Sequence, residues 1–497
     1  ENPFIGRHNG KLDFTAVEKK AFRAQAAQLQ IDRDSKLRRD YRNCGPVFAI
    51  DSRLESDEID DAVGLFRAPD GTTWVHIHIA DPSRFVHPND TLDLLARQRV
   101  QSLFIPEKVA TMFPANFSRQ HFSLLPDKTN YAFTFAVQLN PSTGQVMNYD
   151  ISPSFIDKVV AMTYDQADDL LVAASRKEAP TLHKPVPASQ VAALNTLLEL
   201  SEVRRRHRER AGAVFLDQPR PEVEVADSGE IVKVAAVRDS ESLTRGMVSE
   251  FMILVGEVTA MFASRHSIPI PFRSQAKRPS PNGFVPQGSA HLCPTTASAA
   301  VAPLFEPPVS PLKNSRPKTP NHGTESQPRL FPAVTDVNPG EHAGLGLPAY
   351  CQATSPIRRY TDLLVHHQIK SYLRGESLPF SSSKISSMIS QLEATQLQLN
   401  SLSNNSNRYW ILRFLERQDP ARVYEALVAG DSMFGVQCAV WLLELGWKTS
   451  FMVDSGRSPV RGEKVKVRVH HVDAFKDEIV LMEDTPTPSS APPPSPL

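Results

Sequence analysis

The 497-residue sequence has few cysteines, no excess of charge of either sign and no long apolar run. Its four cysteines (Cys44, Cys293, Cys351 and Cys438) lie far apart without a Cys-x-x-Cys pair, which argues against a disulfide framework and a zinc ribbon. Lys plus Arg number 55 and Asp plus Glu number 55, so any nucleic-acid binding must come from local basic surface rather than net charge. No apolar run approaches the roughly 18 residues of a membrane helix, so we expect no membrane partner.

The composition is that of an ordinary globular protein, with 41% hydrophobic and 22% charged residues. Short strands alternate with helical stretches; Val75, Ile77 and Ile79 alternate with His76 and His78, the period of a strand. The sequence therefore predicts an α+β fold of mixed or antiparallel sheets flanked by helices. We expect helices near 11–35, 165–173, 190–210, 243–264 and 385–402, the first opened by a capping box of Thr15 and Glu18.

Composition also suggests how the chain is divided. Residues 279–340 hold 13 of the 41 prolines and little periodicity, which indicates an atypical or inserted segment. After Asp419-Pro420, alternating runs such as Val465-Lys466-Val467-Arg468-Val469 are typical of a small OB-type barrel. We expect a helical lead-in (1–45), a large domain (46–420), the barrel (421–485) and an unstructured tail (486–497).

An acidic segment carries the strongest chemical signal. Residues 51–61 hold six carboxylates in eleven residues, among them Asp51, Asp57, Glu58, Asp60 and Asp61. Clustered oxygens suit Mg²⁺, and two such ions about 3.5–4 Å apart can activate a water and stabilise the leaving oxygen of a phosphodiester. On this segment alone, a solvated acidic turn remains the alternative.

A second segment, Thr354-Ser-Pro-Ile-Arg-Arg-Tyr-Thr-Asp362, places two arginines near the start of a helix. Because cations there oppose the helix dipole, Arg358 and Arg359 suggest that an anion such as a phosphate binds nearby. In isolation, an Arg–Asp surface pair with Asp362 explains the pattern equally well.

Flat side chains for stacking on single-stranded RNA are also present. Phe104, Tyr164 and Phe215 follow strand or turn patterns, although each alone suits a core aromatic. The run from Arg204 to Arg210 is either a track for RNA or a solvated helix face.

Together these segments resemble the ribonuclease II family, the RNB exoribonucleases. The resemblance is carried by Asp57-Glu-Ile-Asp-Asp-Ala62, His76-Ile-His-Ile-Ala-Asp-Pro-Ser83, Phe104-Ile-Pro106, Met162-Thr-Tyr164, Ser249-Glu-Phe-Met252 and Tyr350–Leu363. It implies an RNB catalytic domain followed by an OB-type RNA-binding domain. It also implies Mg²⁺-dependent, 3′-to-5′ hydrolysis of single-stranded RNA to nucleoside 5′-monophosphates in RNA processing and decay, by a monomer.

The resemblance also assigns roles. Asp51, Asp60 and Asp61 match the metal-binding carboxylates, with Glu58 or Asp57 in a further ligand position, and Arg358 matches the arginine at the scissile phosphate. The positions that match RNA-contacting residues of the family are Phe104, Tyr164, Phe215 and Glu250. The variant Asp-Glu-Ile-Asp-Asp is similar to the plant-organelle and cyanobacterial branch, which favours a chloroplast or mitochondrion over the cytoplasm.

Two other functions remain to be weighed. A catalytically silent RNB scaffold would bind RNA as a regulator, but such loss should alter the aspartates or Arg358, and both are present. An acidic calcium-binding domain leaves the Ser-Pro-Ile-Arg-Arg segment unexplained.

Overall fold

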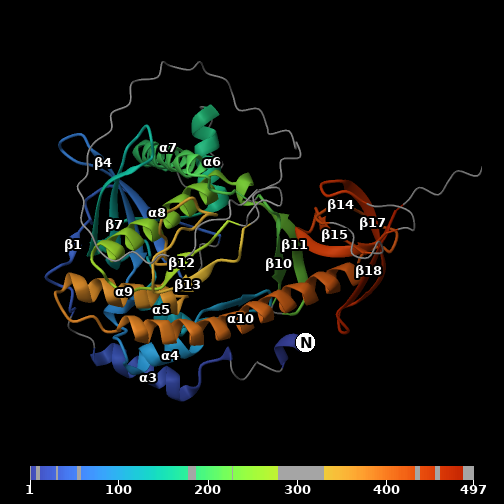
Figure 1. Cartoon of the computed structure of the whole chain (residues 1–497), viewed down its shortest axis with the longest axis horizontal. Helices are drawn as coiled ribbons and strands as arrows, with labels where there is room; N and C mark the ends of the chain where they lie inside the picture. The colour runs from blue at the N-terminus through green and yellow to red at the C-terminus, as the bar shows by residue number, and fades with distance from the viewer. Residues whose placement is uncertain are drawn as a thin grey trace, which may run out of the picture.

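A computed structural model describes most of the chain (Figure 1). The described residues are 2–6, 12–28, 32–52, 58–176, 186–215, 217–226, 228–277, 330–430, 437–453 and 459–484. Asp57, most of the proline-rich 279–340 and the tail 486–497 lie outside them, and with them the predictions made for those residues.

A seven-stranded sheet organises the large domain. Its neighbouring strands are antiparallel except at the two edges, where β1 pairs with β8 and β2 with β9 in parallel. In spatial order the strands are β1 (Arg39–Asp40), β8 (Val146–Ile156), β7 (Asn130–Leu139), β4 (Thr73–Ala80), β3 (Asp61–Arg67), β2 (Val47–Asp51) and β9 (Val159–Thr163).

Helices cover both faces of this sheet, because each strand alternates its side chains between two cores. Val75, Ile77 and Ile79 point into one core, which α6 (Tyr164–Arg176), α7 (Ala188–Arg210) and α8 (Leu243–Arg265) help to build. Residues Val47, Ala49 and Ala62 belong to the second core. That core is closed by α3 (Ala16–Gln28), α4 (Thr91–Arg99), α5 (Ala115–His121), α9 (Tyr360–Leu373) and α10 (Ser382–Glu416).

The sequence predicts no apolar stretch long enough to cross a membrane. Among the described helices, α8 alone is apolar and long enough to do so. However, 67% of its most apolar window is buried, and Leu254, Val255 and Val258 lie in the first core. The helix therefore packs as an interior element of the domain.

A closed five-stranded barrel follows the large domain, as the sequence predicted. Each strand pairs with two others in the order 1-2-3-5-4, the arrangement of an OB-type barrel. The strands are β14 (Val423–Val428), β15 (Gln437–Leu442), β16 (Trp447–Met452), β17 (Lys464–Asp473) and β18 (Glu478–Glu483).

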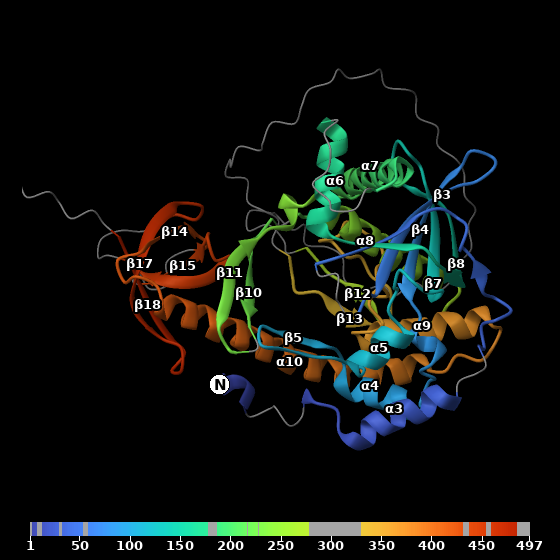
Figure 2. The same ribbon diagram turned by 180° about the vertical axis from the view of Figure 1, so that it is seen from behind.

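Two elements connect the barrel to the large domain (Figures 1 and 2). Helix α10 runs without a break from beneath the sheet to the barrel, where Glu416 accepts a 2.8 Å hydrogen bond from the amide of Ala474. The ribbon of β10 (Arg220–Val225) and β11 (Ile231–Val237) packs against the barrel core. The remaining short elements are α1 (Pro3–Gly6), η1 (Pro82–Arg84), β5 (Leu103–Ile105), β6 (Lys108–Ala110), η2 (Asp239–Glu241), β12 (Phe272–Ser274) and β13 (Val334–Asp336).

Several boundaries differ from the sequence-based expectation. The Thr15–Glu18 capping box forms as predicted, but it starts α3 at Ala16 rather than near residue 11. Helix α10 extends to Glu416 instead of ending near 402. The proline-rich stretch is described again from residue 330, and within it β13 pairs with β12.

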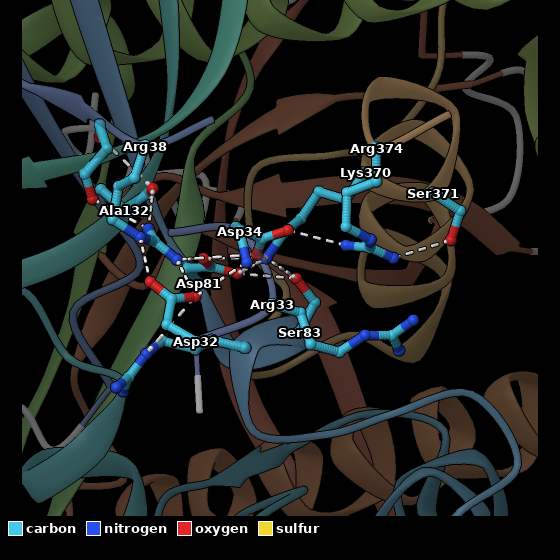
Figure 3. A network of polar contacts seen from close by, with 12 residues as sticks. Asp32, Arg33, Asp34, Arg38, Asp81, Ser83, Ala132, Lys370, Ser371 and Arg374 are labelled. Atoms are coloured by element: carbon cyan, nitrogen blue, oxygen red, sulfur yellow. Dashed lines mark hydrogen bonds and ion pairs between the residues drawn. The ribbon is translucent and has the colours of Figure 1, made fainter. Parts of the chain in front are cut away.

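A buried network of ion pairs joins the N-terminal segment, the turn that follows strand β4, and helix α9 (Figure 3). The ammonium of Lys370 lies 2.7 Å from Asp81 and 2.5 Å from Asp34. Asp81 also pairs with Arg38 at 3.2 Å, and Arg374 reaches Asp34 at 2.7 Å. Because opposite charges surround each buried group, the network locks these three segments together.

Candidate active site

The sheet brings the acidic residues together at one end of two neighbouring strands. Asp51 ends β2 and Asp61 begins β3, and because these strands are antiparallel neighbours, the two carboxylates lie at the same end of the sheet. Asp60 and Glu58 are buried just before β3. The solvated turn considered from the sequence is therefore wrong for residues 58–61.

Asp60 connects the acidic segment to the arginine segment, 298 residues away. Its Oδ1 accepts a 2.9 Å hydrogen bond from the amide of Ile357, and its Oδ2 lies 3.2 Å from Nε of Arg358. The Arg358 side chain remains 43% exposed, and its Nη2 donates to Ser355 at 3.1 Å. A guanidinium held by a buried carboxylate is thus presented at the site.

The buried carboxylates carry strongly shifted pKa values. Burial raises the pKa of Asp60 to about 7 and that of Asp61 to about 6, and the guanidinium of Arg358 only partly offsets this. The charge of Asp51 further raises the pKa of Asp61. Burial therefore disfavours the ionised form of both carboxylates, and a further cation beside them would favour it.

A group of carboxylates of this kind fits a hard divalent cation. Mg²⁺ needs only one or two protein carboxylates together with substrate phosphate, and Asp51 and Asp61 supply such oxygens. The described residues contain no cluster of three or more His, Cys, Asp or Glu side chains arranged to hold a metal. A complete two-ion ligand set is therefore not found in the described part of the chain, which leaves out Asp57.

The arginine segment differs in one respect from the sequence-based interpretation. Helix α9 begins at Tyr360, so Arg358 and Arg359 precede it instead of opposing its dipole. Asp362, in the first turn, accepts from the amide of Ser355 at 2.9 Å and from Nη2 of Arg359 at 2.7 Å. The predicted Arg–Asp pair thus forms, but with Arg359, while Arg358 is directed to Asp60.

Ser102, which no sequence pattern identifies, links this centre to the hairpin that carries Phe104. The Ser102 hydroxyl lies 3.0 Å from a Glu58 carboxylate oxygen and accepts from the amide of Met112 at 2.9 Å. The Ser102 amide donates to the carbonyl of Arg358 at 2.9 Å. Two residues later, in β5, the Phe104 ring is 48% exposed, as a stacking surface must be.

Tyr164 opens α6 next to the carboxylates. Burial and the charges of Asp61 and Asp51 raise the pKa of its hydroxyl, so the phenol stays protonated. The guanidinium of Arg245 lies over its ring, 4.3 Å from the centroid. Tyr164 is therefore an aromatic residue at the edge of the acidic site.

Phe215 and Glu250 meet through an arginine that the sequence analysis did not single out. Arg208 forms a buried ion pair with Glu250, and its Cζ lies 5.0 Å from the ring centroid of Phe215. Arg204 forms a second buried pair, with Glu257. The solvated helix face favoured for 204–210 is therefore wrong for its buried side, and holds only for exposed residues such as Arg206.

Comparison with known proteins establishes the family. The model of the RNB domain matches residues 38–375. The chain belongs to the RNB-domain family. Among its relatives, an uncharacterized ribonuclease of Synechocystis is 32% identical over 88% of this chain and 59% of its own length. A chloroplastic/mitochondrial ribonuclease II of Arabidopsis thaliana is 32% identical over 88% of this chain and 49% of its own.

These relatives agree with the plant-organelle and cyanobacterial branch suggested by the Asp-Glu-Ile-Asp-Asp variant. This RNB protein spans about half the length of the curated relatives it matches. The apo form of Mycoplasma genitalium RNase R superposes with a TM-score of 0.73 at 17% identity. The match covers 95% of this chain and 75% of that one, and shows the shared fold, barrel included. The predicted α+β class and the RNB architecture are thereby confirmed.

Proposed function

We propose that this RNB protein is a Mg²⁺-dependent exoribonuclease that shortens single-stranded RNA from the 3′ end and releases nucleoside 5′-monophosphates. The observation that carries the proposal is the pair of Asp60 and Arg358. It holds a partly exposed guanidinium beside two further carboxylates at the end of the sheet. A site of this kind can bind a phosphodiester and stabilise the charge that develops on it.

Each predicted residue then has a chemical task. Asp51, Asp60 and Asp61, with Glu58 or Asp57, would hold two Mg²⁺ ions. Bound there, Mg²⁺ would supply charge for the phosphate and an acidified water. Arg358 orients the scissile phosphate and neutralises the charge that builds on its oxygens. Arg359, through Asp362, keeps the segment before α9 in place and leaves its remaining N–H groups for RNA.

The aromatic residues would hold the strand without reading its sequence. Phe104 stacks on the base at the 3′ end, with Tyr164 beside the scissile bond, and stacking of this kind contributes about 1–3 kcal/mol per base. Phe215 would contact a nucleotide and Glu250 would act near the RNA 3′ end, and both lie against Arg208. We propose a monomer that acts in RNA processing and decay, in a chloroplast or mitochondrion.

The runner-up is a catalytically silent RNB scaffold that binds RNA as a regulator. Asp60, Asp61 and Arg358 are all present and assembled, which favours the enzyme. The deciding assay incubates the protein with a 5′-labelled oligoribonucleotide and Mg²⁺, then with EDTA. A metal-dependent ladder that shortens from the 3′ end, with mononucleotide product, supports the enzyme. An intact but gel-shifted oligonucleotide supports the regulator.

A further inference from the structure

Arg245 and Tyr164 form a stacked pair that two helix ends hold in place. Arg245 is in the first turn of α8, and Tyr164 is the first residue of α6. The neighbouring Thr244 donates through its amide and its hydroxyl to Oδ1 of Asp168, at 2.8 and 2.7 Å. Since Asp168 belongs to α6, these bonds fix the start of α8 against α6 and set the guanidinium over the ring.

This pair borders the acidic site. Burial and the carboxylates of Asp61 and Asp51 raise the pKa of Tyr164, while the guanidinium groups of Arg245 and Arg358 lower it. Thr163, the residue before Tyr164, is the register partner of Asp51 in the β2–β9 ladder, so Tyr164 follows directly on the strand position beside that carboxylate. Tyr164 thus lies within the influence of both the carboxylates and the guanidinium groups, with Arg245 directly over its ring.

Arg245 differs from the other arginines near the site because no carboxylate pairs with it among the described residues. Arg208, Arg358 and Arg359 each pair with a carboxylate. Within the described ranges, the structure gives Arg245 the contact with the Tyr164 ring and no ion pair. A cation in the first turn also opposes the dipole of α8, so local helix stability does not explain its presence.

We propose that Arg245 binds the backbone phosphate next to the scissile one, with the nucleotide between them lying against Tyr164. The proposal rests on the function proposed above and extends its binding site by one phosphate. A guanidinium stacked on an aromatic ring keeps its N–H groups free at its edge, where a phosphate accepts two of them. Arg245 would thereby hold the strand in line while Arg358 acts on the reacting phosphate.

A chemical double-mutant cycle tests this contact. RNA affinity is measured by fluorescence anisotropy in the Asp60→Asn protein, with and without Arg245→Gln. The probes are an oligoribonucleotide and versions with a neutral methylphosphonate at each 3′-terminal linkage in turn, all with 2′-O-methyl ribose at that linkage. We expect Arg245→Gln to weaken binding of the unmodified RNA about tenfold. In the Asp60→Asn protein, the methylphosphonate next to the scissile linkage should weaken RNA binding by a similar factor. Combined with Arg245→Gln, it should weaken RNA binding little more than either change alone.

The salt dependence of binding provides a second readout. Loss of one phosphate contact should lower the slope of log affinity against log salt by about 1. Arg39→Gln is the charge-matched control, because Arg39 pairs with Asp150 at the opposite sheet edge and should change neither quantity. If the two losses multiply at every linkage, Arg245 contacts none of those phosphates and the proposal is overturned.

This outcome is separable from that of the proposed function, because the cycle measures binding without hydrolysis. If Arg245 couples to a phosphate but the unmutated protein does not shorten RNA, the proposed activity is overturned and the proposed Arg245 contact is supported. If the unmutated protein shortens RNA but no such coupling is found, the proposed contact is overturned and the proposed activity is supported.

Discussion

The amide of Ser102 donates a 2.9 Å hydrogen bond to the carbonyl oxygen of Arg358. Because the hydroxyl of the same serine bonds to Glu58, one buried residue joins the arginine segment, the acidic segment and the hairpin of Phe104. The distance between the stacking surface and the guanidinium is thereby set by short hydrogen bonds within the domain, in the absence of any substrate.

Replacing Ser102 by alanine should therefore affect both stability and activity. The Glu58 carboxylate and the Met112 amide each lose a partner, which should lower the free energy of unfolding by about 1–3 kcal/mol. The displaced hairpin should also lower kcat/KM on RNA. Urea unfolding and steady-state hydrolysis measure the two effects.

Ser118→Ala is the matched control for that variant. The Ser118 hydroxyl is buried on α5, and among the described residues it has no hydrogen-bond partner. Its removal should cost less than about 1 kcal/mol, since no bond is broken. Equal losses in the two variants would show that Ser102 has no special connecting role.

Asp60→Asn should nearly abolish turnover and leave RNA affinity within about threefold. The amide keeps a similar shape but removes the charge that orients Arg358, so kcat should fall by at least about 10². Single-turnover hydrolysis and anisotropy separate the two quantities. Asp70→Asn, in an exposed turn, is the control and should keep normal turnover. Wild-type turnover by Asp60→Asn would contradict the proposed assignment.

Metal binding should depend on pH between about 5 and 8. Without metal, the folded protein keeps protons on Asp60 and Asp61 up to pKa values of about 7 and 6, whereas unfolded aspartate loses its proton near 3.9. The free energy of unfolding contributed by these groups therefore falls as the pH rises from about 4 to about 7. Mg²⁺ binds the ionised carboxylates and so should raise Tm more at pH 8 than at pH 5.5.

Thermal unfolding with Mg²⁺ or EDTA at the two pH values measures this difference. Calorimetric titration in buffers of different ionisation enthalpy should also detect proton release on Mg²⁺ binding near pH 6.5. The Asp61→Asn variant should show a smaller pH dependence. An identical Mg²⁺ increment at both pH values would refute a metal site at these carboxylates.

Lys370→Met should be strongly destabilising. It leaves Asp81 and Asp34 buried without their shared cation, a loss of about 3–5 kcal/mol. Combining it with Asp81→Asn should cost less than the sum of the single changes, because the two groups neutralise each other. Arg39→Met, which breaks an exposed pair with Asp150, should cost less than about 1 kcal/mol. Chemical denaturation compares the variants, and strict additivity would refute the coupling.

Local patterns in the sequence predicted much of the fold. The alternation of Val75, Ile77 and Ile79 identified β4, and the Thr15–Glu18 box formed as predicted although the helix was expected to begin earlier, because both patterns depend on neighbours in the chain. Motifs likewise led to the acidic and arginine segments. Their assembly could not be read from spacing, because Asp60 and Arg358 meet only through the tertiary fold.

Contacts that require long-range pairing were missed for the same physical reason. Arg208 looked like surface charge until Glu250, on another helix, neutralised it. Arg358 and Arg359 precede α9 instead of opposing its dipole, because Ser355 and Asp362 close a turn that the sequence pattern does not specify. Ser102 carried no signal, since a single serine is informative only through its three partners.

The uninterrupted α10, 35 residues long, spans about 52 Å and connects the large domain to the barrel. In the proposed reaction, a rigid connection of that kind would keep the barrel from following a shrinking substrate, so each excised nucleotide would draw the strand across a stationary barrel. RNA shorter than the distance between the site and the barrel would then lose its contact with the barrel in a single step. The length of α10 would then set the shortest RNA that can contact both the site and the barrel, and shorter RNA would bind only weakly.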